Sequence, residues 1–474
     1  MTNSANKETE KRIIGKVHFI GIGGCSMNGL AQILRERSYE VQGSDRSTSP
    51  FTERLTELGV PVFIGHDAKN VEGCGTVIYS AAIPADNPER VRARELGIPE
   101  IERSEALGII SEKYSDVIGI AGCHGKTTIT SMLALISEIA DSNATVHVGG
   151  MVDFLGGGIR LGSGELFITE ACEYVESFLT LHPTVVLINN IDNDHLDYFK
   201  TFDNIVNAFR KFVKRMPENG LLIGCSDDEH VRALLDEFDL KKLTYGLDTA
   251  FSPDYYPENV EYNELGCPAF DLMHRGERLG RIELNVPGRH NMLNTLAASA
   301  VALSHGMSFA DIARALPEFH SVKRRFEYYG ERDGVKVFHD YAHHPAEIRA
   351  AMDSAVRTCT DGRVFVVFQC NSYTRAKTLF LDNVDCFKTA YEVLVPDIYP
   401  GREKDDGSVH AMDMVDAINR ESHNAKYIAT FEEINEYLKK NAHEGDLVLT
   451  LGSGDVYIQS KLFIKVSSKA FKKR

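Results

Sequence analysis

A glycine-rich loop between a strand pattern and a helical pattern is the feature that most constrains this chain. The strand pattern covers residues 116–121, the loop is Gly122-Cys123-His124-Gly125-Lys126-Thr127-Thr128, and the helical pattern covers residues 128–140. In this context glycines allow backbone N–H groups to close around phosphate oxygens. We expect Lys126 to reach the β and γ oxygens of ATP and Thr127 to offer its hydroxyl to Mg²⁺. The loop therefore predicts a nucleotide-binding α/β domain.

The loop is a variant of the common phosphate-binding pattern. That pattern has a glycine separated by four residues from the Gly-Lys pair, and in this chain the position of that first glycine is Ile120. A purely structural interpretation, a tight turn from strand to helix, explains the glycines. It does not explain a lysine followed by two threonines at the start of the helix, so phosphate binding is the favoured interpretation.

The chain is expected to form three α/β domains, because 474 residues are too many for one hydrophobic core. Strands and helices alternate in three blocks, which is typical of α/β folds. We predict a Rossmann-like N-terminal domain over residues 1–112, a central P-loop ATPase domain with a mainly parallel sheet over residues 113–322, and a Rossmann-like C-terminal domain over residues 323–474. The strands expected in the outer two domains are residues 16–20, 40–42, 76–80, 335–339, 364–368, 391–395 and 447–451.

Composition excludes several classes of protein. A net charge of −16 argues against a nucleic-acid binder. The sequence has no run of eighteen apolar residues that could span a membrane, and residues 1–15 have no apolar core of signal-peptide type. The nine cysteines form no Cys-x-x-Cys pair and are expected to be free thiols in a reducing compartment. We therefore expect a cytoplasmic protein, and composition leaves its oligomeric state open.

Polar residues follow two further strand patterns of the central block. Glu170 ends one pattern, and a second, over residues 184–189, leads to Asp192, Asp194 and His195. Ligands bind at the carboxyl ends of strands in open α/β sheets. A carboxylate and an imidazole there can complete a magnesium site, but an ordinary polar histidine beside a solvated acidic turn fits the same pattern.

Taken together, these motifs resemble those of the Mur ligase family over nearly the whole chain. The run His18-Phe19-Ile20-Gly21-Ile22-Gly23-Gly24, the turn Gly43-Ser44-Asp45 and the segment that begins at Ser80 resemble the uridine-nucleotide domain of that family. The resemblance implies a UDP-sugar site. Its candidate residues are Gly21, Gly23, Gly24, Ser44, Asp45 and Ser80.

The resemblance also implies the residues that handle ATP. The family loop usually has threonine where this chain has Cys123, and the match implies that Thr127, Glu170 and His195 hold Mg²⁺. The segment over residues 287–294 resembles the part that holds adenine, which makes His290 and Asn294 contact candidates. Arg325 resembles the arginine that the C-terminal domain brings to the ATP phosphates, a task that suits an always charged, bidentate donor. Asp340, in Asp340-Tyr341-Ala342-His343-His344-Pro345, completes the ATP-binding set.

One motif departs from the family pattern. The family usually has Pro-His before an aromatic and a basic residue, and this chain has Cys370-Asn371-Ser372-Tyr373-Thr374-Arg375. Tyr373 and Arg375 are retained, whereas Asn371 replaces the histidine. With His343 they resemble the side of the C-terminal domain that faces the incoming amino acid. His343 and His344 are candidates for a general base, and a structural role fits either equally well.

The resemblance implies an ATP-dependent amide ligase of peptidoglycan precursor synthesis. The implied substrates are UDP-N-acetylmuramate, whose lactyl carboxylate becomes an acyl phosphate, and L-alanine; the implied catalytic residues are Lys126, Glu170, His195 and Arg325. Two other interpretations remain open. Gly21-x-Gly23 with Asp45 would suit a nicotinamide dehydrogenase, although Gly24 and Ser26 break its usual pattern. The replacement at Asn371 would suit a nucleotide-binding module without catalysis.

Overall fold

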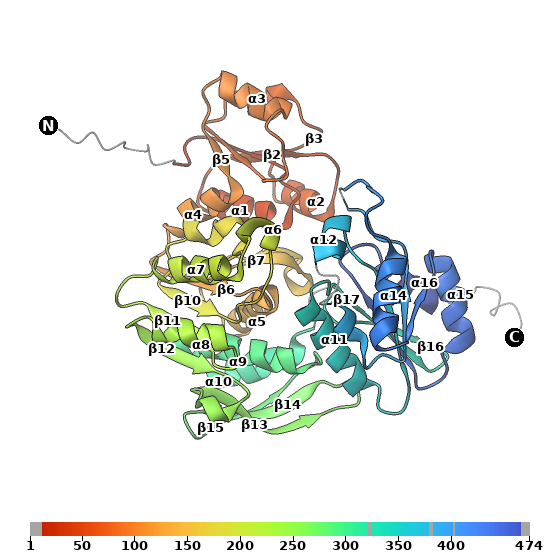
Figure 1. Ribbon diagram of the computed structural model, residues 1–474. Coiled ribbons are helices and arrows are strands. Elements are labelled where there is room, and N and C mark those ends of the chain that lie inside the picture. The colour runs from red at the N-terminus through yellow and green to blue at the C-terminus, as the bar shows by residue number, and fades with distance from the viewer. Residues whose placement is uncertain (1–11, 321–323, 379–382, 402, 466–474) are drawn as a thin grey trace, which may run out of the picture. The chain divides into compact units, whose positions relative to one another are not determined.

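The structure is a computed structural model that describes residues 12–320, 324–378, 383–401 and 403–465 (Figure 1). These residues form two compact units. The first runs to Tyr256 and includes Leu296–Ile312, and the second contains Pro257–Thr295 and the chain from Ala313 onward. The expected domain boundary between residues 322 and 323 lies outside the described residues.

The N-terminal part of the first unit is a parallel five-stranded sheet with the order β3-β2-β1-β4-β5. Its central strand β1 pairs in parallel with both β2 and β4 and is fully buried, which explains its apolar sequence. The strands are β1 (Val17–Ile20), β2 (Val41–Asp45), β3 (Val62–Ile64), β4 (Thr76–Tyr79) and β5 (Glu100–Glu102), and the helices are α1 (Cys25–Glu36), α2 (Pro50–Glu57), η1 (Ala68–Val71), α3 (Pro88–Glu95) and α4 (Arg103–Ser111).

The central sheet of the first unit places β6 between β10 and β9. The order β12-β11-β10-β6-β9-β7 is parallel throughout, and β8 pairs with β7 in antiparallel fashion. Tyr255, at the start of β13, pairs with Tyr245 of β12. The strands are β6 (Asp116–Ala121), β7 (Thr145–Val152), β8 (Gly157–Arg160), β9 (Leu166–Glu170), β10 (Val185–Ile188), β11 (Leu221–Cys225), β12 (Lys241–Tyr245) and β13 (Tyr255–Tyr262).

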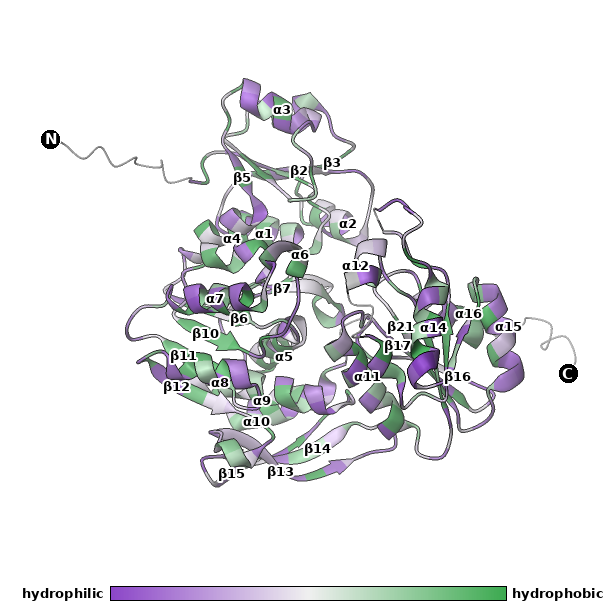
Figure 2. Ribbon diagram, in the orientation of Figure 1, coloured by the Kyte–Doolittle hydropathy of each residue, from purple (hydrophilic) through white to green (hydrophobic). Residues whose placement is uncertain are grey.

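Helices α5 and α7 carry the apolar faces that the central sheet needs. Phe212 of α7 stacks on Phe178 with ring centroids 4.5 Å apart, and a Cβ added to Gly119 of β6 would lie 2.8 Å from the Phe212 ring. The helices around this sheet are α5 (Lys126–Ile139), η2 (Asp153–Leu155), η3 (Tyr174–Thr180), α6 (Leu196–Phe199), α7 (Phe202–Val213), α8 (Glu229–Asp236), η4 (Thr249–Phe251), α9 (Arg289–Ser304) and α10 (Phe309–Ala315), of which α9 and α10 continue across the division between the units. The strand β10 is drawn largely green in Figure 2, as expected for a strand buried on both faces.

The second unit contains a hairpin and a six-stranded sheet. Strands β14 (Pro268–His274) and β15 (Glu277–Glu283) form the antiparallel hairpin. The sheet order is β16-β17-β21-β18-β19-β20, parallel except for the edge strand β16. Its elements are η5 (Leu316–Glu318), β16 (Glu327–Arg332), β17 (Val335–Asp340), α11 (Pro345–Thr358), β18 (Val364–Phe368), α12 (Tyr373–Thr378), η6 (Asp385–Phe387), β19 (Glu392–Val395), α14 (Ala411–Glu421), β20 (Ala425–Tyr427), α15 (Phe431–Asn441), β21 (Leu447–Leu451) and α16 (Tyr457–Ile464).

The fold confirms the predicted class, three α/β regions with mainly parallel sheets. The strands expected at residues 16–20, 116–121, 364–368 and 447–451 are present as β1, β6, β18 and β21. The strands β12 to β15 were not predicted from sequence. Three of them, β12, β13 and β15, are partly exposed and carry many charged residues. Among the described residues, no helix is long and apolar enough to cross a membrane.

Gly43 of β2 is expected to be required for packing of the Gly21–Gly24 segment. A Cβ at position 43 would lie 2.6 Å from the carbonyl oxygen of Phe19 and 2.5 Å from Cδ1 of Ile22. Gly43→Ala should therefore lower the free energy of unfolding by about 1–3 kcal/mol, measured by urea titration with circular dichroism. Gly157→Ala is the matched control, since a Cβ there would meet no atom within 4 Å. Equal stability of the two variants would contradict this packing.

Candidate active site

The phosphate-binding loop joins β6 to α5. Gly122 has φ 132° and Gly125 has φ 86°, backbone conformations that favour glycine. The loop rests on the residues after β10, because Asn190 accepts hydrogen bonds from the Cys123 N–H (to its carbonyl, 3.2 Å) and the His124 N–H (to Oδ1, 2.8 Å). No side chain caps the start of α5. The N–H groups of its first turn are therefore directed toward a site that suits an anion.

Lys126, the first residue of α5, is held by an acidic partner. Its Nζ lies 2.8 Å from Oε2 of Glu173 and donates to the carbonyl of Cys123 at 3.0 Å. Burial lowers the pKa of Lys126, but the Glu173 carboxylate more than compensates and holds that pKa above its ordinary value. Lys126 is therefore a permanent cation beneath the loop. Glu173 is not among the residues predicted from sequence, although it lies only three residues after Glu170.

Thr127 and Glu170 come together as the sequence predicted. The Thr127 hydroxyl donates to Oε2 of Glu170 at 3.1 Å, and Oε1 of Glu170 accepts from the Gly149 N–H at 2.6 Å. Two neighbouring oxygen ligands of an octahedral Mg²⁺, each about 2.1 Å from the ion, lie about 3.0 Å apart. A hydroxyl and a carboxylate at this separation fit the donor type and the spacing that Mg²⁺ requires.

His195 lies beside Glu173 and Asp194. Its Nε2 is 3.8 Å from Oε1 of Glu173 and 3.7 Å from Oδ2 of Asp194, and its ring centroid is 4.6 Å from that of Tyr174. Ligand atoms of Glu173, Asp194 and His195 all lie within 4.8 Å of one another. Of the three predicted metal ligands, Thr127 and Glu170 are therefore in direct contact, whereas His195 lies beside Glu173, which was not predicted and which also binds Lys126.

Cys123, at the position where the family loop usually has threonine, both donates and accepts hydrogen bonds. Its Sγ accepts from the Asp192 N–H at 3.2 Å and donates to the Asp192 carbonyl at 3.4 Å. Burial raises the pKa of this thiol well above its ordinary value, so it stays protonated and can donate. Oδ2 of Asp192 lies 3.1 Å from Nε2 of His124. Asp192 therefore holds the phosphate-binding loop, and the solvated-turn interpretation does not describe it.

The six predicted UDP-sugar residues lie at the carboxyl ends of β1, β2 and β4. The Gly21 N–H donates to the Ser44 carbonyl at 2.8 Å, and the Gly23 N–H donates to Oδ2 of Asp45 at 2.8 Å. The Ser80 N–H donates to the Ile20 carbonyl at 3.3 Å. Gly24 precedes α1, which has no side-chain cap. A second helix start suited to an anion therefore lies in this unit.

The hydroxyl of Ser44 is buried and faces an acidic residue. Ser44 Oγ donates to Oε2 of Glu89 at 2.5 Å, and Oε1 of Glu89 accepts from Nδ2 of Asn70 at 2.6 Å. Nδ1 of His66 lies 3.1 Å from the same Oε2. The side chain of Ser44 therefore belongs to a buried network around Glu89, and its carbonyl oxygen holds the Gly21–Gly24 segment by accepting from the Gly21 N–H.

Arg325 in the second unit is held by α11. Its Nη1 lies 3.0 Å from Oε1 of Glu347, and its neighbours Arg324 (φ 68°) and Phe326 (φ 41°) both adopt left-handed backbone conformations. Asp340 supports this turn, since its Oδ2 accepts from the Phe326 N–H at 2.7 Å. Burial raises the pKa of Asp340 to about 6. Asp340 therefore shapes the segment that carries the arginine.

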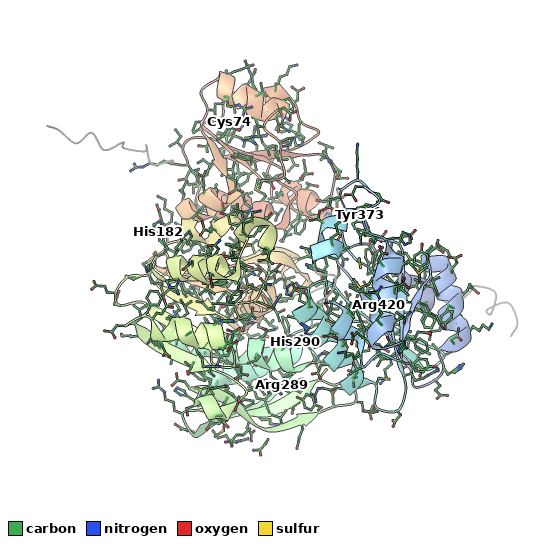
Figure 3. The ribbon with its side chains drawn as sticks, viewed as in Figure 1. Cys74, His182, Arg289, His290, Tyr373 and Arg420 are labelled. Carbon is green, nitrogen blue, oxygen red and sulfur yellow. The ribbon has the colours of Figure 1, made fainter. Side chains whose placement is uncertain are left out.

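His290, His343 and Arg325 belong to one neighbourhood of the second unit. Burial, and then the charge of Arg325, lower the pKa of His290 to about 4. The His343 N–H donates to Oε2 of Glu347 at 3.2 Å, and burial lowers the His343 pKa. His290 lies on α9 (Figure 3), where Asn294 is buried and donates to Oδ1 of Asn291 at 3.1 Å. Both histidines are therefore neutral at pH 7.

The segment with the unusual Asn371 is also ordered by polar contacts. Asn371 Nδ2 donates to Oγ of Ser453, and Asn371 pairs with Tyr399 in an isolated bridge. Tyr373 begins α12 (Figure 3), and the Arg375 N–H donates to Oγ of Ser372 at 3.3 Å. The Arg375 charge contributes to the lowered pKa of His343. The three predicted amino-acid-side residues therefore belong to one region of this unit.

Three family models match successive parts of the chain. The model described as "Mur ligase family, catalytic domain" matches residues 16–115, "Mur ligase middle domain" matches residues 120–302, and "Mur ligase, glutamate ligase domain" matches residues 324–454.

Relatives match the chain over nearly its whole length. A protein of Alkaliphilus metalliredigens named UDP-N-acetylmuramate–L-alanine ligase is 44% identical and covers 94% of this chain and 96% of its own. A protein of Acetivibrio thermocellus with the same name is 43% identical, over 95% of each chain. Among solved structures, UDP-N-acetylmuramate-alanine ligase from Thermotoga maritima superposes with a TM-score of 0.76 at 28% identity, over 95% of this chain and 98% of that one.

Glu89 is expected to make the stability of the first unit depend on acid pH. Burial raises the pKa of Glu89, but hydrogen bonds from His18, Ser44 and Asn70 lower it to about 2, below the ordinary value of 4.5. The ionised carboxylate therefore stabilises the fold above pH 4.5 by about 3 kcal/mol, and this contribution is lost as the pH falls toward 2.

The measurement is the free energy of unfolding of the protein and of Glu89→Gln between pH 7 and pH 3. We expect the difference between them to be largest at neutral pH and to shrink below pH 4.5. Glu57→Gln is the matched control, because that carboxylate is exposed and forms its ion pair with the exposed Arg54 at 3.6 Å. A difference that does not change with pH would contradict an ionised Glu89.

Proposed function

The chain belongs to the Mur ligase family and adds L-alanine to UDP-N-acetylmuramate with cleavage of ATP in peptidoglycan synthesis; we propose that Lys126, Glu170, His195 and Arg325 are its catalytic residues. The observation that supports this most strongly is the junction of β6 and α5, where Lys126 is a permanent cation below an uncapped helix start. A nicotinamide dehydrogenase would leave this cation without a task.

The first step in this proposal is attack of the lactyl carboxylate of UDP-N-acetylmuramate on the γ-phosphorus of ATP. Gly122, Cys123, His124, Gly125, Lys126, Thr127 and Thr128 surround the phosphates, and His290, Asn294, Arg325 and Asp340 complete the ATP-binding set. Lys126 and Arg325 neutralise the charge of the transferred phosphoryl group, which lowers the barrier without covalent chemistry by the protein. Mg²⁺, which Thr127, Glu170 and His195 would hold, would supply further positive charge at the phosphate oxygens. The products are an acyl phosphate and ADP.

The second step is capture of the acyl phosphate by the amine of L-alanine. The amine loses a proton, attacks the carbonyl carbon and expels phosphate, which forms the amide. His343, Tyr373 and Arg375 are proposed to contact the amino acid, and a cation such as Arg375 suits its carboxylate. His343 is neutral because burial lowers its pKa, so it can accept a proton.

The UDP part of the substrate is proposed to bind at the start of α1. Gly21, Gly23 and Gly24 form the turn that leads to the uncapped start of α1, and this helix start favours the negative charge of the diphosphate. Ser44, Asp45 and Ser80 complete the site. The domain limits 1–112, 113–322 and 323–474 remain a proposal, supported by family matches over residues 16–115, 120–302 and 324–454. We also propose a cytoplasmic location, supported by nine free cysteines and by the use of ATP.

Phosphate release is expected to require both substrates. With purified protein, ATP and Mg²⁺, release should be rapid only when UDP-N-acetylmuramate and L-alanine are present together, and glycine and L-serine should support less. The measurement is a coupled phosphate assay with each substrate omitted in turn. Release that exceeds a single turnover excludes a binding module without catalysis. Faster release with another amino acid would show that Asn371 has changed the acceptor.

Arg325→Ala is expected to lower turnover by about 10²- to 10³-fold, with little change in the dissociation constant for UDP-N-acetylmuramate. The reason is that the charge of Arg325 acts on the transferred phosphoryl group. Steady-state kinetics and calorimetric titration measure the two quantities. Arg357→Ala is the control, because Arg357 is exposed, pairs with Asp353 at 3.0 Å on the same helix and lies 5.9 Å from the ring centroid of Tyr262. Weaker UDP-sugar binding with unchanged turnover would contradict this role.

A further inference from the structure

A buried histidine connects the two ligand-binding edges of the first unit. His147 lies on β7 and is 2% exposed. Its Nε2 is 3.1 Å from Oγ of Ser26, near the start of α1, and its Nδ1 is 3.0 Å from Oγ1 of Thr169, which precedes Glu170 on β9. One imidazole thus bridges the helix after the Gly21–Gly24 loop and the strand that carries Glu170.

The hydrogen-bond partners define the tautomer of His147. Arg103 can only donate, and its Nη1 lies 3.4 Å from Oγ of Ser26. Thr169 has one hydroxyl hydrogen, which it donates to the carbonyl oxygen of Glu170, so Thr169 accepts from Nδ1 of His147, and Nε2 accepts from Ser26. The proton lies on Nδ1 and is donated to Thr169.

The chain of donors continues to the backbone of Glu170. Thr169 Oγ1 accepts from Nδ1 and donates to the carbonyl oxygen of Glu170 at 3.3 Å. Burial and the charge of Arg103 lower the pKa of His147 to about 4, so the imidazole is neutral at pH 7 and keeps one donor and one acceptor. Each hydrogen bond in the series Arg103, Ser26, His147, Thr169, Glu170 is therefore donated by the earlier residue to the next one.

Packing holds the imidazole firmly in this position. A Cβ added to Gly29 of α1 would lie 2.9 Å from Cδ2 of His147, so the helix backbone rests directly against the ring. Two residues along β7, the Gly149 N–H donates to Oε1 of Glu170 at 2.6 Å. The strand that carries His147 therefore also contacts the carboxylate that the proposed function gives to Mg²⁺.

We propose that His147 is a positioning residue, which sets the start of α1 and the end of β9 in register through this single directed series of hydrogen bonds. The inference rests on the proposed roles of the Gly21–Gly24 loop and of Glu170. It assigns to His147 no contact with substrate or metal. Its effect is to orient the Glu170 carboxylate and the α1 helix start, so both ligand sites depend on the same ring.

Loss of the ring is expected to weaken both sites at once. Removal of a hydrogen-bonded group behind a metal ligand commonly costs 10- to 100-fold in metal affinity or activity. His147→Phe should therefore raise the Mg²⁺ concentration for half-maximal turnover by about tenfold or more, and raise KM for UDP-N-acetylmuramate. KM for L-alanine should remain unchanged, because nothing in this series reaches the second unit.

Two polar replacements should separate the effects. His147→Asn keeps a donor near the Nδ1 position and loses the acceptor at Nε2, so it should preserve the Mg²⁺ requirement and raise KM for the UDP-sugar. His147→Gln places its amide near the Nε2 position. It should preserve KM for the UDP-sugar and raise the Mg²⁺ requirement. If His147 had only a structural role, both variants would lose thermal stability, and the Mg²⁺ requirement and KM for the UDP-sugar would change together. These two variants therefore test the inference even if His147→Phe does not fold.

The matched control is Thr145→Val on the same strand. Thr145 is fully buried, and its hydroxyl donates to the Gly162 carbonyl and accepts from the Gly162 N–H, each at 3.1 Å. Thr145→Val should lower the thermal stability. The Mg²⁺ concentration for half-maximal turnover and KM for UDP-N-acetylmuramate should stay unchanged. The inference would be overturned if Thr145→Val changed both constants as much as His147→Phe does. It would also be overturned if His147→Phe folded and left both constants unchanged.

A double-mutant cycle distinguishes this inference from the proposed function. Ser26→Ala and Thr169→Val should be non-additive in turnover when His147 is present and additive in His147→Gln and His147→Asn. Glu170→Gln separately tests the metal role through the Mg²⁺ requirement. If Glu170→Gln leaves that requirement unchanged, the metal proposal fails, and the Ser26–Thr169 coupling still decides the inference: additivity with His147 present overturns it.

Discussion

Parallel pairing of β6 with β9 and β10 is the constraint on which the site of the first unit depends. Parallel strands end at the same edge of a sheet, so the loop after β6, Glu170 at the end of β9 and Asn190 after β10 meet there. The register places Ile120 opposite Glu170 and Ala121 opposite Ile188. A shift by one residue would turn the polar side chains to the other face and separate them.

The pair of Lys126 and Glu173 shows how this edge holds charge without a ligand. Glu173 is 1% exposed, and a buried carboxylate is costly unless a cation and hydrogen bonds accompany it. Lys126 supplies the cation at 2.8 Å. The same arrangement keeps the lysine charged and directed to the loop, which suits a group that must meet phosphate. The ion pair of Lys126 with Glu173 therefore both stabilises the fold and keeps the lysine positioned for a phosphate.

The candidate site was predictable from sequence where a single segment carries both geometry and chemistry. Gly122, Gly125 and Lys126 lie in one loop, and their glycines adopt the left-handed backbone that the motif implies. Thr127 and Glu170 are 43 residues apart, yet strand ends are predictable from apolar runs, so their meeting could be expected. Glu173 was not predicted, because the direction of a side chain beyond the strand end depends on packing from neighbouring elements.

The sequence alone determined the alternation of strands and helices, the phosphate-binding loop and the family, because these depend on local periodicity and on contiguous motifs. Tertiary structure alone decided which side chains meet. His147 and Ser26 are 121 residues apart, and Lys126 and Glu173 are 47 apart. No local pattern marks such pairs, since a buried histidine in a β strand has the same sequence signature whether it faces a serine, a threonine or an apolar core. Only the packing of α1 against β7, and of β7 beside β9, gives that histidine its partners.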